Sequence, residues 1–195
     1  AECDAFFTAI PDSNFEQALI DLGIDTNPTP DDQVLTENIE GVTNLEVNNK
    51  NIANLTGIED FTALTTLNCN SNQLTSLDLS NNIALTVLKC NSNQLTSLNV
   101  SNNTVLTDLR LIDNQLTSLD VSNNIALTRL ECFSNQLISL DVSNNSALEL
   151  LNCTSNQLTS LDVSANPALI VLNFNSNQLT SLDVISNTAL TVLRC

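Results

Sequence analysis

The chain has 195 residues, of which 22 are acidic and 5 are basic, so its formal net charge is −17. A surface this negative repels phosphate backbones, which argues against binding of DNA or RNA. Histidine, tryptophan, tyrosine and methionine are absent, and loss of histidine removes the commonest general base and metal ligand. The sequence also lacks an apolar run of about 18 residues, so we expect no membrane span.

Residues 1–41 form the first distinct region, with ten acidic residues and no lysine or arginine. The segment 13–16 (Ser-Asn-Phe-Glu) matches a capping box, and a stop signal follows at Gly23. Between them, one helical face collects the apolar residues Phe15, Ala18, Leu19 and Leu22. Residues 25–32, with two prolines, predict a loop. We therefore expect residues 1–41 to be an acidic helical N-terminal cap.

Residues 42–195 repeat with a period of 21 residues, and we call each repeat a coil. The recurring Asn-Gln pair places its glutamine at Gln73, Gln94, Gln115, Gln136, Gln157 and Gln178. Each coil carries L-x-x-L-x-[LCF]-x-x-N-x-L. Six full copies span 64–189, one degenerate copy precedes them, and one partial copy, which we expect to be truncated, ends at residue 195. This periodicity predicts a solenoid.

The signature resembles that of leucine-rich-repeat proteins. The second half of each coil repeats the first, so each unit looks like nested half-coils of 10 and 11 residues, as in a bacterial subclass of short repeats. Residues 10–61 also resemble the N-terminal region of internalin-like proteins, which are secreted or displayed on the bacterial surface. The resemblance implies a mainly β, right-handed leucine-rich-repeat solenoid with two parallel short-strand sheets, little convex helix and a short helical cap.

We expect asparagine to form the turns, because the chain contains only 3 glycines and 4 prolines. Asparagine tolerates left-handed backbone and bonds neighbouring main-chain groups through its amide. Stacking of coils about 4.8 Å apart should align the equivalents of Asn72 and Asn82 into two buried or half-buried amide ladders.

Five cysteines share one repeat position, which we call the Cys column: Cys69, Cys90, Cys132, Cys153 and Cys195. Leu111 and Phe174 fill the same position in the other two coils, so it should be an inward apolar slot with free thiols. One alternative is disulfides between adjacent coils, which in-register parallel neighbours disfavour. Another is a metal site, which lacks histidine and Cys-x-x-Cys spacing. We therefore expect no cofactor and no metal. Cys3 has no evident partner.

Aspartates recur at the outward centre of the second half-coil, with Asn99 as one interruption. We call this the Asp column: Asp78, Asp120, Asp141, Asp162 and Asp183. Stacked like charges should raise their pKa values or recruit cations. The favoured interpretation is a solvated face, and the alternative is weak Ca²⁺ binding between coils.

Outward positions of the first half-coil vary, whereas the second half-coil is nearly invariant. The candidate partner-binding residues, which we call the strand patch, are Lys89, Asp108, Arg110, Ile112, Arg129, Glu131, Phe133 and Leu150. Arginines and an aromatic residue clustered in consecutive coils resemble an interface hot spot. Neutral drift is the alternative, since exposed departures from a repeat are expected to have no structural cost.

These observations predict a non-catalytic binding module of a secreted or cell-surface bacterial protein, which contacts a protein partner through the expected concave sheet. The alternative is a rigid spacer or stalk for domains beyond residue 195. An enzyme is disfavoured because no perturbed acid or nucleophile in a cleft is indicated. The absence of tryptophan and tyrosine disfavours carbohydrate binding.

Overall fold

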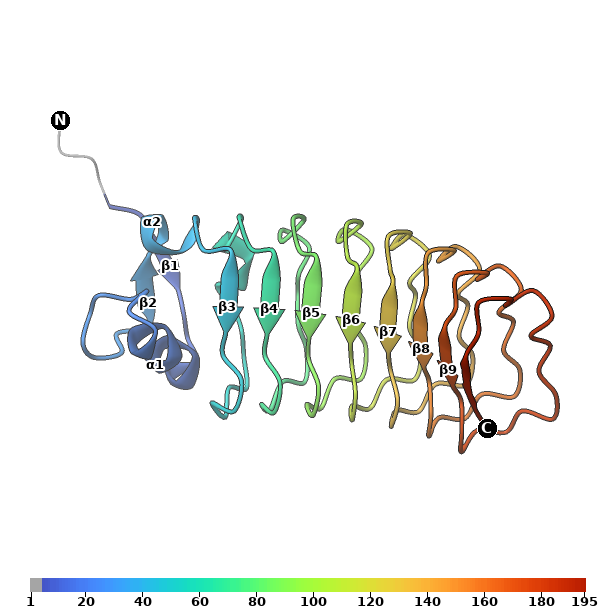
Figure 1. The fold of residues 1–195 in the computed structure, drawn as a ribbon. Helices are drawn as coiled ribbons and strands as arrows, with labels where there is room; N and C mark the ends of the chain where they lie inside the picture. The colour runs from blue at the N-terminus through green and yellow to red at the C-terminus, as the bar shows by residue number, and fades with distance from the viewer. Residues whose placement is uncertain (1–4) are drawn as a thin grey trace.

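The computed structural model describes residues 5–195, which form an elongated solenoid with a helical region at its N-terminal end (Figure 1). This N-terminal region contains β1 (Phe7–Ala9), α1 (Ser13–Asp21), β2 (Gln33–Leu35) and α2 (Thr36–Ile39). The strands β1 and β2 pair antiparallel. The sequence did not indicate this pair, because strands of three residues are too short to show a clear alternation.

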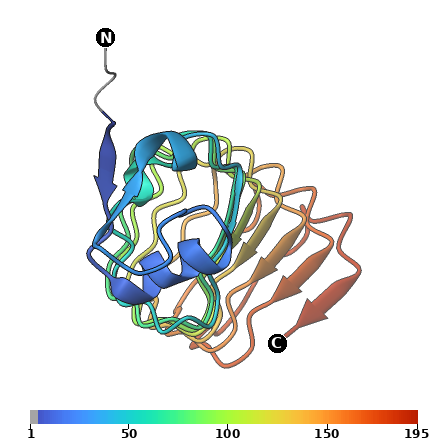
Figure 2. The same ribbon diagram turned by 90° about the vertical axis from the view of Figure 1, so that its left-hand side faces the viewer.

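The repeats build one parallel sheet of eight strands, to which each coil adds one strand in chain order. The strands are β3 (Asn44–Glu46), β4 (Thr66–Asn68), β5 (Val87–Lys89), β6 (Asp108–Arg110), β7 (Arg129–Glu131), β8 (Leu150–Asn152), β9 (Val171–Asn173) and β10 (Val192–Arg194). A short 3₁₀ helix, η1 (Ile58–Asp60), follows β3. Seen along the solenoid, the coils superpose with their strands on one side (Figure 2). The prediction of a leucine-rich-repeat solenoid is confirmed.

Strict register stacks equivalent residues into columns, so that Leu67 pairs with Leu88 and Leu88 with Leu109. These central leucines are fully buried. Because full burial of one leucine contributes about 1.5–3 kcal/mol, the columns of inward leucines are the main source of stability. The two neighbours of each central residue point outward, which places every outward side chain of the sheet beside its equivalent in the next coil.

The prediction of a second parallel sheet is wrong, since the described residues of the second half-coils form no strand. Side chains in these half-coils form hydrogen bonds with the main-chain N–H and C=O groups that would otherwise pair with a neighbouring strand. Asp78 Oδ1 accepts a hydrogen bond from the Ser80 N–H at 2.9 Å. The Leu79 carbonyl accepts from Asn103 Nδ2 of the next coil at 3.0 Å. The backbone is therefore satisfied without a strand.

Both predicted amide columns are present and buried. Asn135 represents the first: its Nδ2 donates to the carbonyls of Leu111 (2.8 Å) and Cys132 (3.1 Å), and its Oδ1 accepts from the Leu116 N–H (3.0 Å). In the second column, Nδ2 of Asn103 donates to two carbonyls of the preceding coil. The amides thus bond main chain to main chain across coils, which explains why asparagine recurs at both positions.

Helix α1 begins one residue earlier than the predicted capping box. Its N-cap is Asp12, whose Oδ1 accepts from the N–H groups of Asn14 and Phe15. Glu16 does not close the box, because its carboxylate accepts instead from the N–H groups of the Asp31–Asp32 loop at 2.7 and 3.0 Å. The predicted stop is confirmed, since Gly23 ends the helix with a φ of 70°.

Four polar contacts attach α1 to the first coil, one of which is the hydrogen bond from Asn14 Nδ2 to the Asn51 carbonyl at 3.1 Å. Asp12 Oδ2 accepts from the N–H groups of Ala53 and Asn54, both at 2.8 Å. Lys50 forms an ion pair of 2.8 Å with Asp21 at the other end of the helix. The helical face is buried as expected except for Leu22, which is exposed because it lies at the C-cap. One carboxylate, Asp12, therefore both starts the helix and joins it to the solenoid.

Candidate functional site

The strand patch lies on strands β5–β8 and on the first residues after β6 and β7. All of its members are half-buried rather than fully exposed. Since outward neighbours in register are adjacent, the structure brings these residues together on one face. Phe133, the aromatic member of the patch, is likewise half-buried.

Four charged residues at the centre of the patch form what we call the charge quartet. Arg110 donates to both carboxylate oxygens of Asp108, through Nε at 2.9 Å and Nη2 at 2.7 Å. Arg129 Nη1 donates to Glu131 at 3.0 Å. Across the two strands, Arg110 lies 3.9 Å from Glu131 and Arg129 lies 3.8 Å from Asp108. Opposite charges therefore alternate both along and across β6 and β7.

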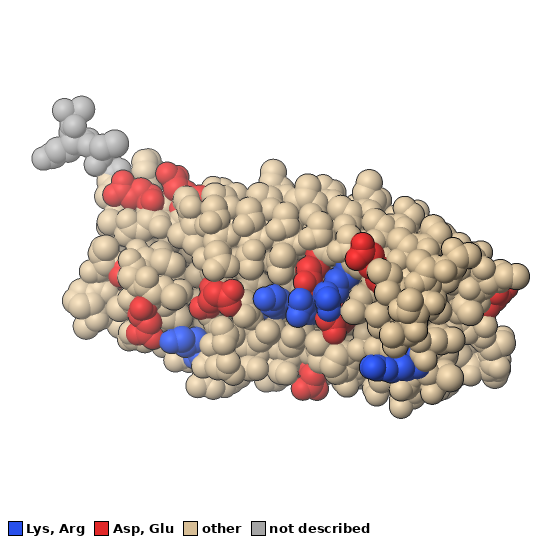
Figure 3. Space-filling view, viewed as in Figure 1, with Lys and Arg blue, Asp and Glu red and all other residues tan. Residues whose placement is uncertain are grey.

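The quartet satisfies its own charges. Hydrogen bonding to Asp108 raises the pKa of Arg110, and the negative charges of Asp108 and Glu131 add to this, while desolvation opposes it. Lys89 lies in register with Arg110, and among the described residues it has no ion-pair partner. Figure 3 shows this basic surface near the centre of the sheet, with acidic surface beside it. The patch thus combines a neutral, oriented centre with one unpaired lysine.

The apolar part of the patch replaces asparagines that link the coils elsewhere. Asn70 Oδ1 accepts from the Asn91 N–H at 2.7 Å, and Asn91 Oδ1 accepts from the Ile112 N–H at 3.0 Å. Ile112 and Phe133 occupy the next two positions, where an apolar side chain has no acceptor to offer the following coil. The replacement at Ile112 gives up a hydrogen bond to the Phe133 N–H worth about 0.5–1.5 kcal/mol. After Phe133, the Thr154 N–H donates instead to Asn152 Oδ1 at 3.2 Å. The departure at Ile112 therefore has a structural cost, which neutral drift does not account for.

Two acidic departures from the repeat escaped the sequence analysis, because they lie just outside the strands. Asp113 stands where other coils have serine, and Glu149 stands where most coils have threonine. Both are exposed, and neither carboxylate has a hydrogen-bond or ion-pair partner among the described residues. The signal that could have found them is the same repeat alignment, extended one or two positions beyond each strand.

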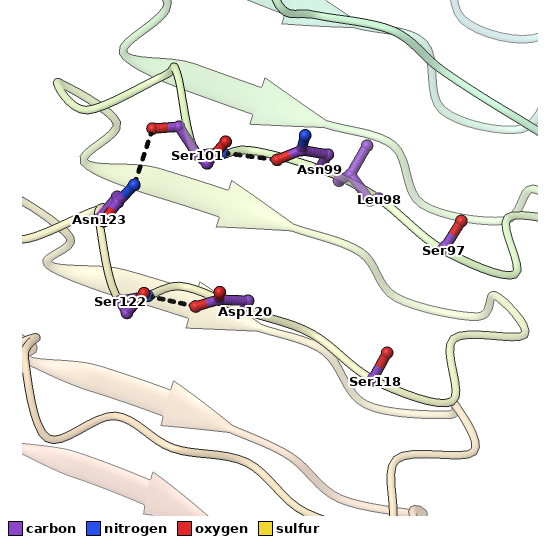
Figure 4. A pocket seen from close by; sticks show the side chains of 8 residues that line it. All are labelled: Ser97, Leu98, Asn99, Ser101, Ser118, Asp120, Ser122 and Asn123. Carbon is purple, nitrogen blue, oxygen red and sulfur yellow. Dashed lines mark hydrogen bonds between the residues drawn. The ribbon is translucent and has the colours of Figure 1, made fainter.

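The second face carries grooves between neighbouring coils. One is lined by Ser97, Leu98, Asn99, Ser101, Ser118, Asp120, Ser122 and Asn123 (Figure 4). Its polar groups hold the turns: Asn99 accepts from the Ser101 N–H, Asp120 from the Ser122 N–H, and Asn123 donates to the Ser101 carbonyl. Similar grooves recur at residues 54–81 and 161–186. Because Asn99, Asp120 and Asn123 hold these turns, the recurrence of Asp and Asn at their positions has a structural explanation.

The Asp column does not behave as its stacking suggested. The pKa values of Asp78, Asp120, Asp141 and Asp162 are lowered, not raised, because each carboxylate accepts hydrogen bonds from the serine two residues later. Repulsion from the neighbouring carboxylates does raise the pKa of Asp141, but this effect is smaller. Among the described residues, no three His, Cys, Asp or Glu side chains converge as metal ligands.

The Cys column occupies the predicted inward slot. Cys69, Cys90, Cys132 and Cys153 are free and fully buried, whereas Cys195 is exposed. The Sγ atoms of Cys69 and Cys90 lie 3.1 Å apart, and this hydrogen bond, with desolvation, raises the pKa of Cys90. Desolvation raises the pKa of Cys132 well above its ordinary value and that of Cys153 to about 12. Cys3 lies outside the described residues. The buried thiols are therefore core residues and poor nucleophiles.

Within residues 5–195, neither α-helix combines the length and apolar character needed to cross a membrane.

Comparison with known proteins finds internalins of Listeria monocytogenes among the similar chains. No protein-family model matches the chain. Over 81 residues the chain is 40% identical to internalin J of Listeria monocytogenes serotype 4b. These 81 residues are 42% of this chain and 8% of that protein. The solved functional domain of internalin J from Listeria monocytogenes, described as including a cysteine ladder, is 37% identical with a TM-score of 0.81. That match covers 100% of this chain and 48% of the internalin J chain.

A second solved structure, internalin C2 from Listeria monocytogenes, matches with a TM-score of 0.72 over 100% of both chains. At 23% identity, this likeness shows the fold alone. The chain therefore spans about half of the solved internalin J domain and a small part of the full-length relative.

Proposed function

We propose that this chain, an internalin-like bacterial leucine-rich-repeat protein, is a non-catalytic module that binds a protein partner through the strand patch. The observation that carries the proposal is the pair Ile112 and Phe133, where coil-linking asparagines are replaced by apolar side chains. A protein that keeps a substitution with a structural cost gains something from it elsewhere. Half-buried apolar side chains beside a neutral, oriented charge cluster suit the desolvated centre of an interface.

The charge quartet supports the same proposal. Its arginines are already oriented by Asp108 and Glu131, so little side-chain entropy remains to be lost when a partner covers them. The quartet also spans two coils that depart from the repeat together. We propose, by the likeness to internalin J, that the module acts outside the cell, either secreted or displayed on the surface.

The experiment is a pull-down from the natural surroundings of the protein, which compares variants on the two faces. We expect Phe133→Ala and Arg110→Ala to weaken retention of the partner, since truncation of an anchor typically costs about 2 kcal/mol or more of binding. Ser139→Ala and Ser160→Ala, on the second face, should retain it. Loss of the partner only in the serine variants would assign function to the second face. Equal retention by all four would favour a spacer.

A further inference from the structure

We infer that the partner of the strand patch is a basic protein surface, whose lysines or arginines surround an apolar centre. This inference rests on the proposed function and adds to it the charge of the partner. It is carried by Asp113 and Glu149, the two exposed acidic departures that flank the patch.

The two carboxylates lie at opposite edges of the patch. Asp113 follows β6, at the C-terminal ends of the strands, and Glu149 precedes β8, at their N-terminal ends. Ile112 and Phe133 lie next to the first edge, and Leu150 lies next to the second. Acidic surface is visible both above and below the central basic group in Figure 3. A partner centred on the apolar side chains would therefore meet a negative charge on two sides.

Glu149 has no structural use that explains it. At the equivalent position of the preceding coils, Thr128 Oγ1 donates to the Thr107 carbonyl at 3.1 Å and Thr107 Oγ1 donates to the Thr86 carbonyl at 3.2 Å. Glutamate has no hydroxyl donor, so this ladder of hydrogen bonds is interrupted at Glu149 and Ile170 and resumes at Thr191, whose Oγ1 donates to the Ile170 carbonyl at 3.2 Å. The carboxylate is exposed, and no basic residue pairs with it among the described residues. It is thus available to a partner.

The distribution of charge over the molecule favours the same partner. Inside the patch the quartet cancels its own charges, which leaves the single positive charge of Lys89 on β5. The negative charges of Asp113 and Glu149 lie at the two strand-end edges, beside the apolar side chains and away from Lys89. The chain as a whole carries −17, which attracts basic proteins during encounter and repels acidic ones. Charges at the rim of an interface act mainly on the association rate and its salt dependence.

The test uses the full chain and three synthetic peptides: KKGLFLGKK, the acidic-flanked EEGLFLGEE and the apolar-free KKGSGSGKK. Affinities are measured by titration in low salt, and the binding site is located from NMR amide shifts. We expect KKGLFLGKK to bind tightest, with shifts at Ile112 and Phe133. The acidic-flanked peptide should bind at least about tenfold more weakly at low salt, and 0.5 M NaCl should remove most of that difference.

Matched variants separate rim charges from total charge. Asp113→Ser with Glu149→Thr restores the residues of the other coils, and we expect it to weaken KKGLFLGKK binding about fivefold. Asp120→Asn with Asp162→Asn removes the same charge from the second face and should leave binding unchanged. Equal weakening by both pairs, or equal affinity for basic and acidic peptides, would overturn the inference, as would failure of all three peptides to bind.

The outcome also distinguishes this inference from the function on which it rests. Binding that is lost in Phe133→Ala but unaffected by the rim pair would retain the strand patch and reject the basic partner. Binding of KKGLFLGKK that is unaffected by Phe133→Ala, with shifts confined to the second face, would reject the strand patch itself.

Discussion

The two halves of each coil share the same L-x-x-L-x-L pattern, but their main-chain N–H and C=O groups find hydrogen-bond partners in different ways. In the first half, the strands satisfy one another, as in the parallel pairing of β6 with β7. In the second half, side chains satisfy the backbone, as Asp141 does for the Ser143 N–H at 2.9 Å. The first half varies from coil to coil, and the second half hardly varies.

The difference teaches where this fold leaves room for function. When main chain bonds to main chain, outward side chains are free to change without loss of the ladder. When side chains supply the hydrogen bonds, changing them removes structure. The invariance of the Asp and Asn positions on the second face therefore reflects their structural role, and variation marks the surface on which binding can evolve. The following predictions test this contrast, from the largest expected effect to the smallest.

Asn135→Ala should destabilise the protein most. Its amide serves the Leu111 and Cys132 carbonyls and the Leu116 N–H. The substitution would leave the Leu116 N–H buried and unpaired, and it would remove one of the two amide donors from each carbonyl, which still accept from Asn114 and Asn156. We expect a loss of about 3 kcal/mol or more in the free energy of unfolding, measured by chemical denaturation. Ser139→Ala, on the exposed second face, is the control and should be neutral. A loss below about 1 kcal/mol for Asn135→Ala would mean that the amide columns are not structural.

Alkaline pH should weaken the solenoid through its buried thiols. The pKa of Cys153 is raised to about 12 in the folded chain, from an ordinary value of 9.0. Above pH 9 the unfolded chain therefore loses this proton while the folded chain keeps it, so the free energy of unfolding falls by roughly 1.4 kcal/mol per pH unit. Between pH 9 and 12 this contribution is lost as pH rises, and below pH 9 it is fully present.

Cys153→Leu should remove that part of the alkaline decline, and the slot tolerates leucine because Leu111 fills it in another coil. Thiol labelling of the native protein should also fail at Cys69, Cys90, Cys132 and Cys153, and succeed after unfolding. Rapid native labelling at these four thiols would contradict their inward orientation.

Glu149→Thr should stabilise the chain slightly. The threonine hydroxyl can donate to the Thr128 carbonyl, as Thr128 does to Thr107 at 3.1 Å, and so extend the ladder. We expect a gain of about 0.5–1 kcal/mol in the free energy of unfolding. Thr107→Val, which interrupts the ladder without a change of charge, should produce a loss of similar size. A stability decrease for Glu149→Thr would indicate a structural role for the glutamate.

Asp141→Asn should have the smallest effect. Asn99 occupies the same position in another coil and accepts from the Ser101 N–H at 3.0 Å, so an amide can hold this turn. We expect an unchanged melting temperature near neutral pH. Millimolar Ca²⁺ should likewise change it no more than Na⁺ at equal ionic strength. A specific rise with Ca²⁺ that Asp162→Asn abolishes would instead support cation binding between coils.

The sequence predicted which residues make up the strand patch, but it did not predict the contacts among them. The repeat alignment placed Arg110, Ile112 and Phe133 on one face, because residues with the same phase stack in register. It could not reveal that Arg110 pairs with Asp108, since ion-pair geometry depends on side-chain rotamers and not on phase. The rim position of Glu149 was missed because the strands are only three residues long, and what flanks them depends on the turns.

The sequence by itself determined the solenoid, its period, its inward columns and the amide stacks, because a 21-residue repeat of apolar and asparagine positions has one way to bury itself. The tertiary structure alone decided that Asp12 rather than Ser13 starts α1, because the carboxylate also reaches the first coil. It likewise decided that only one half of each coil becomes a strand. Identical leucine patterns permit a strand in both halves. In the second half, Asp and Asn side chains bond the main-chain groups that a strand of the neighbouring coil would need, so only the first half forms a strand.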